Sequence, residues 1–273
     1  MELVSWVFIP WLFAVLLDPF QSLAQIPPSL LTPVPLLQWL HLSSSLLLSP
    51  AFLWGLKISM LISLSCVLCK RFTLTAAISS AVLLTLYQAI LRCFKPYNNH
   101  EFVALYAVYI FTMILINSKR TGRIDYSLFS TITLGVLVLT YFFAGASRIL
   151  TSGVEVFFDD SLRAWSVRNR DLMLLPVVLN VNAQNLEPGI FYNALKLGFI
   201  VATLFECLAP VALFSKKFAG VFLWTMLASH FFSLFFLNLL FWQNMLLLIF
   251  FIRYLPQYQP LRLSGRPRFF SIF

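Results

Sequence analysis

Charged residues are scarce in this sequence. Only 11% of its 273 residues are Asp, Glu, Lys or Arg, whereas 60% are hydrophobic. A soluble globule of this size needs more polar surface than these residues can supply. The composition therefore excludes an ordinary soluble domain and indicates an integral, multi-pass membrane protein.

Acidic residues are scarcer than basic ones, ten against 19, which gives a net charge of +9. In a soluble protein this excess would suggest nucleic-acid binding. Here the basic residues lie mainly between apolar runs, where they set the topology of membrane helices, so we expect no nucleic-acid partner. Lys and Arg concentrate on the side that holds the N-terminus, which predicts that both termini are cytoplasmic.

The motifs of common soluble enzymes are absent. The sequence has no H-E-x-x-H, no paired C-x-x-C, no Walker phosphate loop, no G-x-S-x-G and no G-x-G-x-x-G. We therefore expect no metal site and find no support for a hydrolase, an ATPase or a dinucleotide-binding enzyme. Cys66 and Cys69 form a single C-x-x-C at a helix end, which we interpret as small packing residues in preference to a redox pair.

Long apolar runs predict an all-α fold, a polytopic transmembrane helical bundle of about eight spans in one integral membrane domain, residues 1–273. The first run is interpreted as a retained span because no basic residues precede it. After residue 218 few polar residues interrupt the apolar run, so the last two predicted helices form either a helical hairpin or a broken pair. The predicted helices are 3–19, 46–68, 73–93, 100–118, 128–149, 190–214, 218–236 and 238–254.

Two connections are long. Residues 25–45 carry four prolines, which rule out a regular span and favour an interfacial segment with Trp39 and His41 at the headgroup level. Residues 151–189 form the most charged loop, in which we expect a short amphipathic helix capped by Asp159 or Asp160. Residues 255–273 are expected to form a cytoplasmic tail.

Few polar side chains fall within the apolar runs, where each needs a partner or a role. Arg148 ends the fifth predicted helix, and we predict that it pairs with Glu155, Asp159 or Asp160 in the following loop. Glu206 lies inside the sixth predicted helix, four residues before Pro210, which can kink that helix.

The other candidates leave two interpretations open. His230 is either a neutral imidazole bonded to a neighbouring helix or a functional group. Lys57 and Lys196 either extend to the membrane interface or serve a site.

Five segments stand out along residues 97–253. They are NNHEFVALYAVYIF (98–111), TYFFAGASRILTSG (140–153), SLRAW (161–165), FECLAPVALFSKK (205–217) and ASHFFSLFF (228–236). In this order they resemble the membrane region shared by vitamin K-dependent gamma-carboxylases and the bacterial HTTM (horizontally transferred transmembrane) proteins.

The resemblance implies a chemistry and also limits it. In the carboxylases a lysine base deprotonates vitamin K hydroquinone, assisted by a histidine that follows two asparagines, as in Asn98-Asn99-His100. The lysine position carries Arg148, and a guanidinium stays protonated and cannot be a base. The carboxylases also have a lumenal substrate-binding domain to which the resemblance does not extend, so we expect no glutamate carboxylation and leave other enzymatic activity open.

We therefore predict a site that binds a lipid-soluble ligand, either quinone-like or a lipid. Its residues are Asn99, His100, Arg148, Glu206 and His230. Helix depth makes His100 with Arg148 the stronger pair and Glu206 the weaker member. The alternative is a non-catalytic subunit that packs against partner membrane proteins; a transporter lacks the expected paired broken helices.

Overall fold

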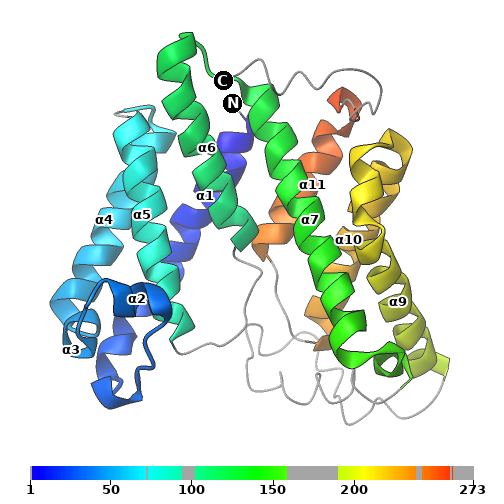
Figure 1. The fold of residues 1–273 in the computed structure, drawn as a ribbon, viewed down its shortest axis with the longest axis horizontal. Coiled ribbons are helices and arrows are strands. Elements are labelled where there is room, and N and C mark those ends of the chain that lie inside the picture. Colours follow the sequence, from blue (N-terminus) through cyan, green and yellow to red (C-terminus); the bar gives the residue numbers. More distant parts are fainter. Residues whose placement is uncertain are drawn as a thin grey trace. The chain divides into compact units, whose positions relative to one another are not determined.

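The computed structural model describes residues 2–71, 73–93, 102–158, 190–237, 242–258 and 260. The described residues form helices and connecting turns, without a strand, so the all-α prediction is confirmed (Figure 1). The long helices are α1 (Glu2–Leu17), α4 (Pro50–Leu68), α5 (Thr73–Arg92), α6 (Phe102–Thr121), α7 (Tyr126–Ser152), α9 (Ile190–Cys207), α10 (Lys216–Leu237) and α11 (Trp242–Tyr254). Within the described residues, these eight helices correspond in order to the eight predicted segments, although not all of them are long enough to be candidate membrane spans.

The stretch between α1 and α4 contains only short helical turns, as its prolines require. They are η1 (Phe20–Gln25), η2 (Pro28–Leu30), α2 (Pro35–Trp39) and α3 (Ser44–Leu47). Trp39 is 75% exposed. Its place at the membrane interface stays a prediction.

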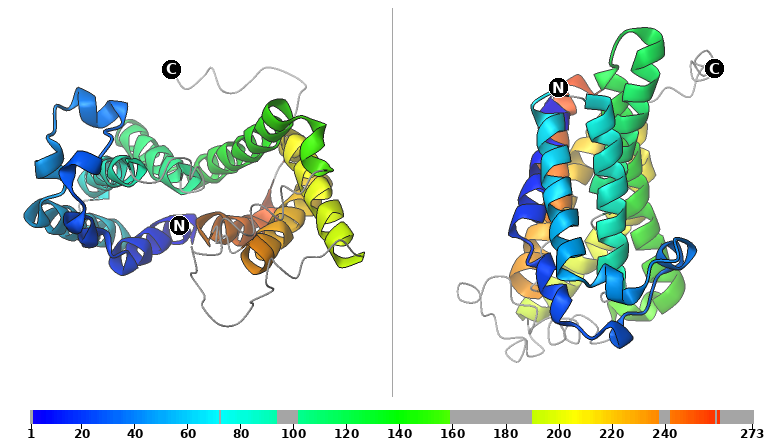
Figure 2. Two further views of the ribbon diagram at one scale, coloured as in Figure 1. Left: turned by 90° about the horizontal axis from the view of Figure 1, so that it is seen from below. Right: turned by 90° about the vertical axis from the view of Figure 1, so that its left-hand side faces the viewer.

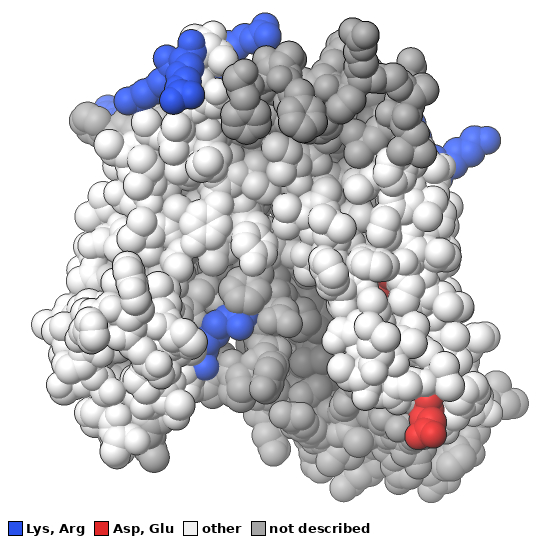
Figure 3. Space-filling view, viewed as in Figure 1, with Lys and Arg blue, Asp and Glu red and all other residues white. Residues whose placement is uncertain are grey.

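Six helical segments are long and apolar enough to cross a membrane within the described part of the chain. They are Leu3–Gln25, Pro50–Leu68, Thr73–Arg92, Val103–Thr121, Tyr126–Ser152 and Lys216–Leu234. Few charged side chains appear on the face drawn in Figure 3. The protein is thus a multi-pass membrane protein. The 13 residues of α11 span only about 20 Å at 1.5 Å per residue, less than a bilayer core.

Side-chain caps and glycine turns fix the helix ends. Ser49 Oγ accepts a hydrogen bond from Phe52 N at the start of α4, and Asp125 Oδ1 accepts one from Leu128 N at the start of α7. Gly122 and Gly153 have φ of 70° and 65° and follow the ends of α6 and α7. Glycine adopts this left-handed conformation without a Cβ clash, so both turns are encoded locally.

The chain divides into two compact units, residues 1–133 and 134–273, and α7 runs from the first into the second. In unit 1, α4 packs against α1 and α5, and α6 packs against α5 and α1 (Figures 1 and 2). Phe8 contacts Phe111 edge-on, with ring centroids 5.5 Å apart, and Phe111 lies 5.3 Å from Phe129. Buried aromatic side chains therefore fill the core of this unit.

A polar cluster in unit 1 lies where α1 ends. Lys57 on α4 donates from Nζ to the main-chain oxygen of Asp18 at 2.8 Å and lies 5.8 Å from the ring of Trp54. The hydroxyl of Tyr87 on α5 donates to Asp18 Oδ2. Two helices thus bind the turn that follows α1, which satisfies polar groups that hydrocarbon would leave unsolvated.

In unit 2, α10 packs against α9, α11 and η7 (Ala209–Leu213). Phe205 and Phe218 stack with ring centroids 5.8 Å apart. After α11, the turn η8 (Leu255–Gln257) leads to Tyr258, whose hydroxyl donates to the main-chain oxygens of Ala212 at 3.1 Å and Leu213 at 2.8 Å. The chain after α11 therefore satisfies carbonyls at the end of η7.

Candidate functional site

Three residues with different tasks share one face of α7. Tyr141, Gly145 and Arg148 follow each other at spacings of four and three residues, which places them in a row along a helix. The helix extends to Ser152. Arg148 is therefore a full turn inside α7 and not at its last residue, as the sequence had suggested.

A second row lies on α9. Phe199, Thr203 and Glu206 are spaced by four and three residues and also share a helix face. Pro210 has no N–H for the carbonyl of Glu206, and its ring crowds that carbonyl, so α9 ends at Cys207 and the chain continues as η7. The prediction of a helix over 190–214 is wrong at this end, and Glu206 lies in the last turn of α9.

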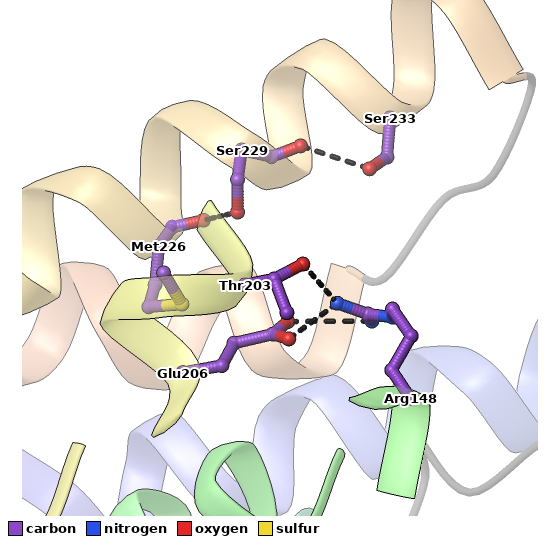
Figure 4. A network of polar contacts seen from close by, with 6 residues as sticks. All are labelled: Arg148, Thr203, Glu206, Met226, Ser229 and Ser233. Carbon is purple, nitrogen blue, oxygen red and sulfur yellow. Dashed lines mark hydrogen bonds and ion pairs between the residues drawn. The ribbon is translucent and has the colours of Figure 1, made fainter. Parts of the chain in front are cut away.

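Arg148 joins the two rows (Figure 4). Its Nη1 donates to Glu206 Oε2 at 2.5 Å and to Thr203 Oγ1 at 2.9 Å, while Nη2 lies 3.5 Å from Glu206 Oε1. The guanidinium also lies 5.2 Å from the centre of the Phe199 ring. The guanidinium therefore contacts all three residues of the α9 row: Glu206 through an ion pair, Thr203 through a hydrogen bond and Phe199 through cation–π attraction.

The two partners differ in exposure. The side chain of Glu206 is 11% exposed and that of Arg148 is 25% exposed. A guanidinium has five N–H donors, and the contacts above use three of them. Within the described residues, Nε–H and one Nη2–H of Arg148 have no protein acceptor, so the partly exposed side of the guanidinium can still donate.

Gly145 brings α7 and α9 close enough for this pairing. A Cβ at position 145 would lie 2.7 Å from Glu206 Cβ, 3.0 Å from Cys207 N and 3.1 Å from Cys207 Sγ. Small residues allow membrane helices to approach closely, and here no larger side chain fits without moving the α9 backbone. Gly145 is thus a positioning residue for the Arg148–Glu206 pair.

His230 lies on α10 and is bound to the first residue of the α7 row. Tyr141 Oη and His230 Nε2 share a hydrogen bond, and their rings lie 5.7 Å apart. Tyr141 also meets Phe222 edge-on at 5.6 Å. Since Tyr141 precedes Arg148 by seven residues, about 10 Å along the helix, this pair is separate from the guanidinium contacts.

The hydroxyls of α10 in Figure 4 do not compete for Arg148. Ser229 Oγ donates to the main-chain oxygen of Met226 at 2.8 Å, and Ser233 Oγ donates to that of Ser229 at 2.9 Å. Each bond stays within its own helix. The polar contacts of Arg148 among the described residues therefore come from α9.

Two predictions about Arg148 are corrected by this geometry. Its ion-pair partner is Glu206, whereas Glu155 is exposed; Asp159 and Asp160 lie outside the described residues. Helix depth had also separated Glu206 from Arg148, but the two side chains are in direct contact. His100, which was ranked above Glu206 as the partner of Arg148, lies outside the described residues.

No family model, no curated protein and no solved structure matches this chain. The site therefore has to be interpreted from its own geometry. Asn99 and His100, which complete the predicted set, lie outside the described residues. Glu206 and Arg148 are in contact, and His230 joins the same face of α7 through Tyr141.

Sequence analysis missed Thr203 and Tyr141. Both are common in apolar helices and neither is charged, so nothing marks them individually. The available signal was their spacing: Thr203 is three residues from Glu206, and Tyr141 is seven from Arg148. A search for polar residues one or two turns from each intramembrane charge would have found both.

Proposed function

We propose that this protein binds the oxygen-bearing head of a lipid-soluble ligand at Arg148. The observation that supports the proposal is the partly exposed guanidinium, which keeps two N–H donors beyond its contacts with Thr203 and Glu206. A carbonyl or hydroxyl oxygen is the natural acceptor for such donors in an apolar surrounding. Phe199, Thr203 and Glu206 hold the guanidinium in place for that oxygen.

The charge of the pair favours a neutral ligand. The carboxylate of Glu206 offsets the positive charge of Arg148 at 2.5 Å. A phosphate or carboxylate would be attracted by Arg148 but repelled by Glu206, whereas a neutral carbonyl oxygen needs only a hydrogen-bond donor. The ligand class is therefore a quinone-like molecule or a neutral lipid with an ester or hydroxyl oxygen.

The resemblance to the HTTM and vitamin K-dependent carboxylase membrane region supports the quinone-like member of this class. In that comparison Arg148 occupies the place of the lysine base. Because a guanidinium does not release its proton at physiological pH, the proposed role is binding without glutamate carboxylation. Asn99, His100 and His230 belong to this proposal as the remaining polar groups of the resemblance.

The alternative is a non-catalytic subunit that packs against other membrane proteins. Large apolar side chains exposed on the helices of unit 2, such as Leu197, Leu204 and Trp224, are compatible with it. The same side chains suit lipid tails equally well. Purification must therefore decide between a bound small molecule and a bound protein.

The test is extraction of the protein purified in mild detergent. Lipid-soluble molecules that remain bound are identified by mass spectrometry in the wild type, in Arg148→Gln and in Lys217→Gln, which removes an exposed cation of α10. We expect one neutral, oxygen-bearing compound in the wild type and in Lys217→Gln, and at least tenfold less in Arg148→Gln. Equal amounts in all three proteins, or a stoichiometric protein partner without such a compound, would overturn the proposal.

A further inference from the structure

A groove of about 380 Å³ runs between α4 and α5 in unit 1. Its surface is mainly apolar, with Ile62, Ala76 and Leu83 among the lining residues, and the other side chains that line it are small: Ser59, Ser63, Cys66, Thr75 and Ser79. Ser80 Oγ donates to Ser63 Oγ at 3.1 Å, and Ser63 Oγ donates to the main-chain oxygen of Met60 at 3.0 Å. These bonds hold the two helices together and satisfy the buried hydroxyls, so the groove exists because its walls lack bulk.

Two cations lie at one end of this groove. The α4–α5 turn follows Cys66 by a few residues and precedes Thr75, and it carries Lys70 and Arg71, both exposed. Arg71 N donates to Cys66 O at 2.9 Å and Lys70 N donates to Val67 O at 3.1 Å. This pair of bonds is the Schellman arrangement, which ends a helix with a left-handed residue.

Lys70 is that left-handed residue, with φ of 56°. Glycine is favoured at this position, and a lysine there places a long cationic side chain where the turn itself does not need one. Among the described residues, the side chains of Lys70 and Arg71 form no ion pair or hydrogen bond. Their charges are available to a ligand from outside the chain.

Further cations lie at the same end of unit 1. Because α4, α5 and α6 follow one another as packed antiparallel neighbours, the end of α6, with Lys119 and Arg120, lies on the side of the α4–α5 turn. Figure 3 shows Lys and Arg atoms gathered at the upper left, over the ends of these helices. Of these cations, Lys70 and Arg71 lie on the turn that joins the two helices of the groove, whereas Lys119 and Arg120 lie on α6, which does not line it.

We propose that this groove binds an anionic phospholipid, with one acyl chain between α4 and α5 and the phosphate at Lys70 and Arg71. Both parts of the site are needed for this assignment. The apolar groove suits an acyl chain, and the two cations at its end suit a negatively charged phosphate. An anionic phospholipid carries both groups in one molecule. An apolar helix of a partner or of a second copy would leave both cations unmatched.

The test is native mass spectrometry of the full chain in detergent, titrated with phosphatidylglycerol or with phosphatidylcholine. The charge variant is Lys70→Gly with Arg71→Gln, since glycine preserves the left-handed turn. The matched control, Lys119→Gln with Arg120→Gln, removes the same charge at the same end of the unit, away from the groove. A third variant, Ser79→Phe, fills the groove and keeps both cations.

We expect one tightly bound phosphatidylglycerol, with phosphatidylcholine at least tenfold weaker. The charge variant should bind phosphatidylglycerol about 30-fold more weakly, as the loss of two surface cations implies. Ser79→Phe should also lose the lipid, and the control should keep it. Equal binding of both lipids, an equal loss in the control, no loss in Ser79→Phe, or a protein cross-linked to Cys66 in the groove would each overturn the assignment.

Discussion

Lys57 in unit 1 and Arg148 in unit 2 are both cations on apolar helices, yet they are used differently. Lys57 is buried and donates to the main-chain oxygen of Asp18 beyond the end of α1. Arg148 is partly exposed and pairs with the carboxylate of Glu206. Lys57 thus satisfies a main-chain oxygen after a helix, whereas Arg148 pairs with a side chain and keeps two N–H donors unused among the described residues. We infer that the type of partner distinguishes a structural cation from a candidate ligand-binding one.

The largest expected effect is that of Arg148→Met. It leaves the buried carboxylate of Glu206 without its cation, which should lower the free energy of unfolding by about 3 kcal/mol. Thermal unfolding in detergent measures the change. In the double variant Arg148→Met with Glu206→Leu, more than half of that loss should be recovered; a double variant less stable than the single one would contradict the pairing.

Gly145→Ala should produce the next largest effect. The new Cβ would meet Glu206 Cβ and the backbone of Cys207, and this overpacking should cost about 2 kcal/mol in unfolding free energy. Gly135→Ala is the matched control, because a Cβ at that position of α7 meets nothing within 4 Å. Alanine favours helix, so the control should be as stable as the wild type or more stable. Equal losses in both variants would show that the α7–α9 crossing is not tight.

A smaller effect is expected from Lys57→Met, the counterpart of the Arg148 substitution. Methionine preserves most of the side-chain volume, and the hydrogen bond to Asp18 O that it removes is worth about 1 kcal/mol. The proposed ligand retained at Arg148 should be unchanged. If Lys57→Met destabilises the protein as much as Arg148→Met does, the distinction between the two cations is lost.

The smallest effect concerns Tyr258, which donates to main-chain oxygens in unit 2 as Lys57 does in unit 1. Tyr258→Phe removes the donor to Ala212 O and Leu213 O and should cost about 0.5 kcal/mol at neutral pH. Burial raises the pKa of the Tyr258 hydroxyl to about 12. An unfolded tyrosine has a pKa of about 10, so the folded state keeps its stability below pH 10 and loses stability between pH 10 and 12, where the unfolded chain releases this proton first.

The unfolding temperature of the wild type should therefore fall more steeply than that of Tyr258→Phe between these two pH values. Parallel curves would show that the hydroxyl is not shielded from solvent in the folded protein.

The helices were predictable because apolar runs fix both their number and their places. The observed ends differ by a few residues where local caps act, as at Asp125 and Gly153. The exception is α9, which Pro210 ends seven residues early although the apolar run continues. Hydrophobicity identifies a segment that can lie in a membrane, but a missing N–H decides where its helix stops.

The site was only partly predictable. Arg148, Glu206 and His230 stand out because polar groups are rare in apolar helices. Their pairing depends on which helices pack together, and one sequence does not carry that information. The Arg148–Glu206 contact follows from the close approach at Gly145, a residue whose importance is visible only when the opposing backbone of Cys207 is known.

The crossing at Gly145 also has a consequence for thiol chemistry. All four cysteines are free, and the sulfur of Cys207 packs against Gly145, whereas Cys69 is exposed at the end of α4. An alkylating reagent should therefore modify the exposed Cys69 faster than the half-buried Cys207. A variant that widens the crossing, such as Gly145→Ala, should raise the rate at Cys207 and leave the rate at Cys69 unchanged, without any label introduced into the protein.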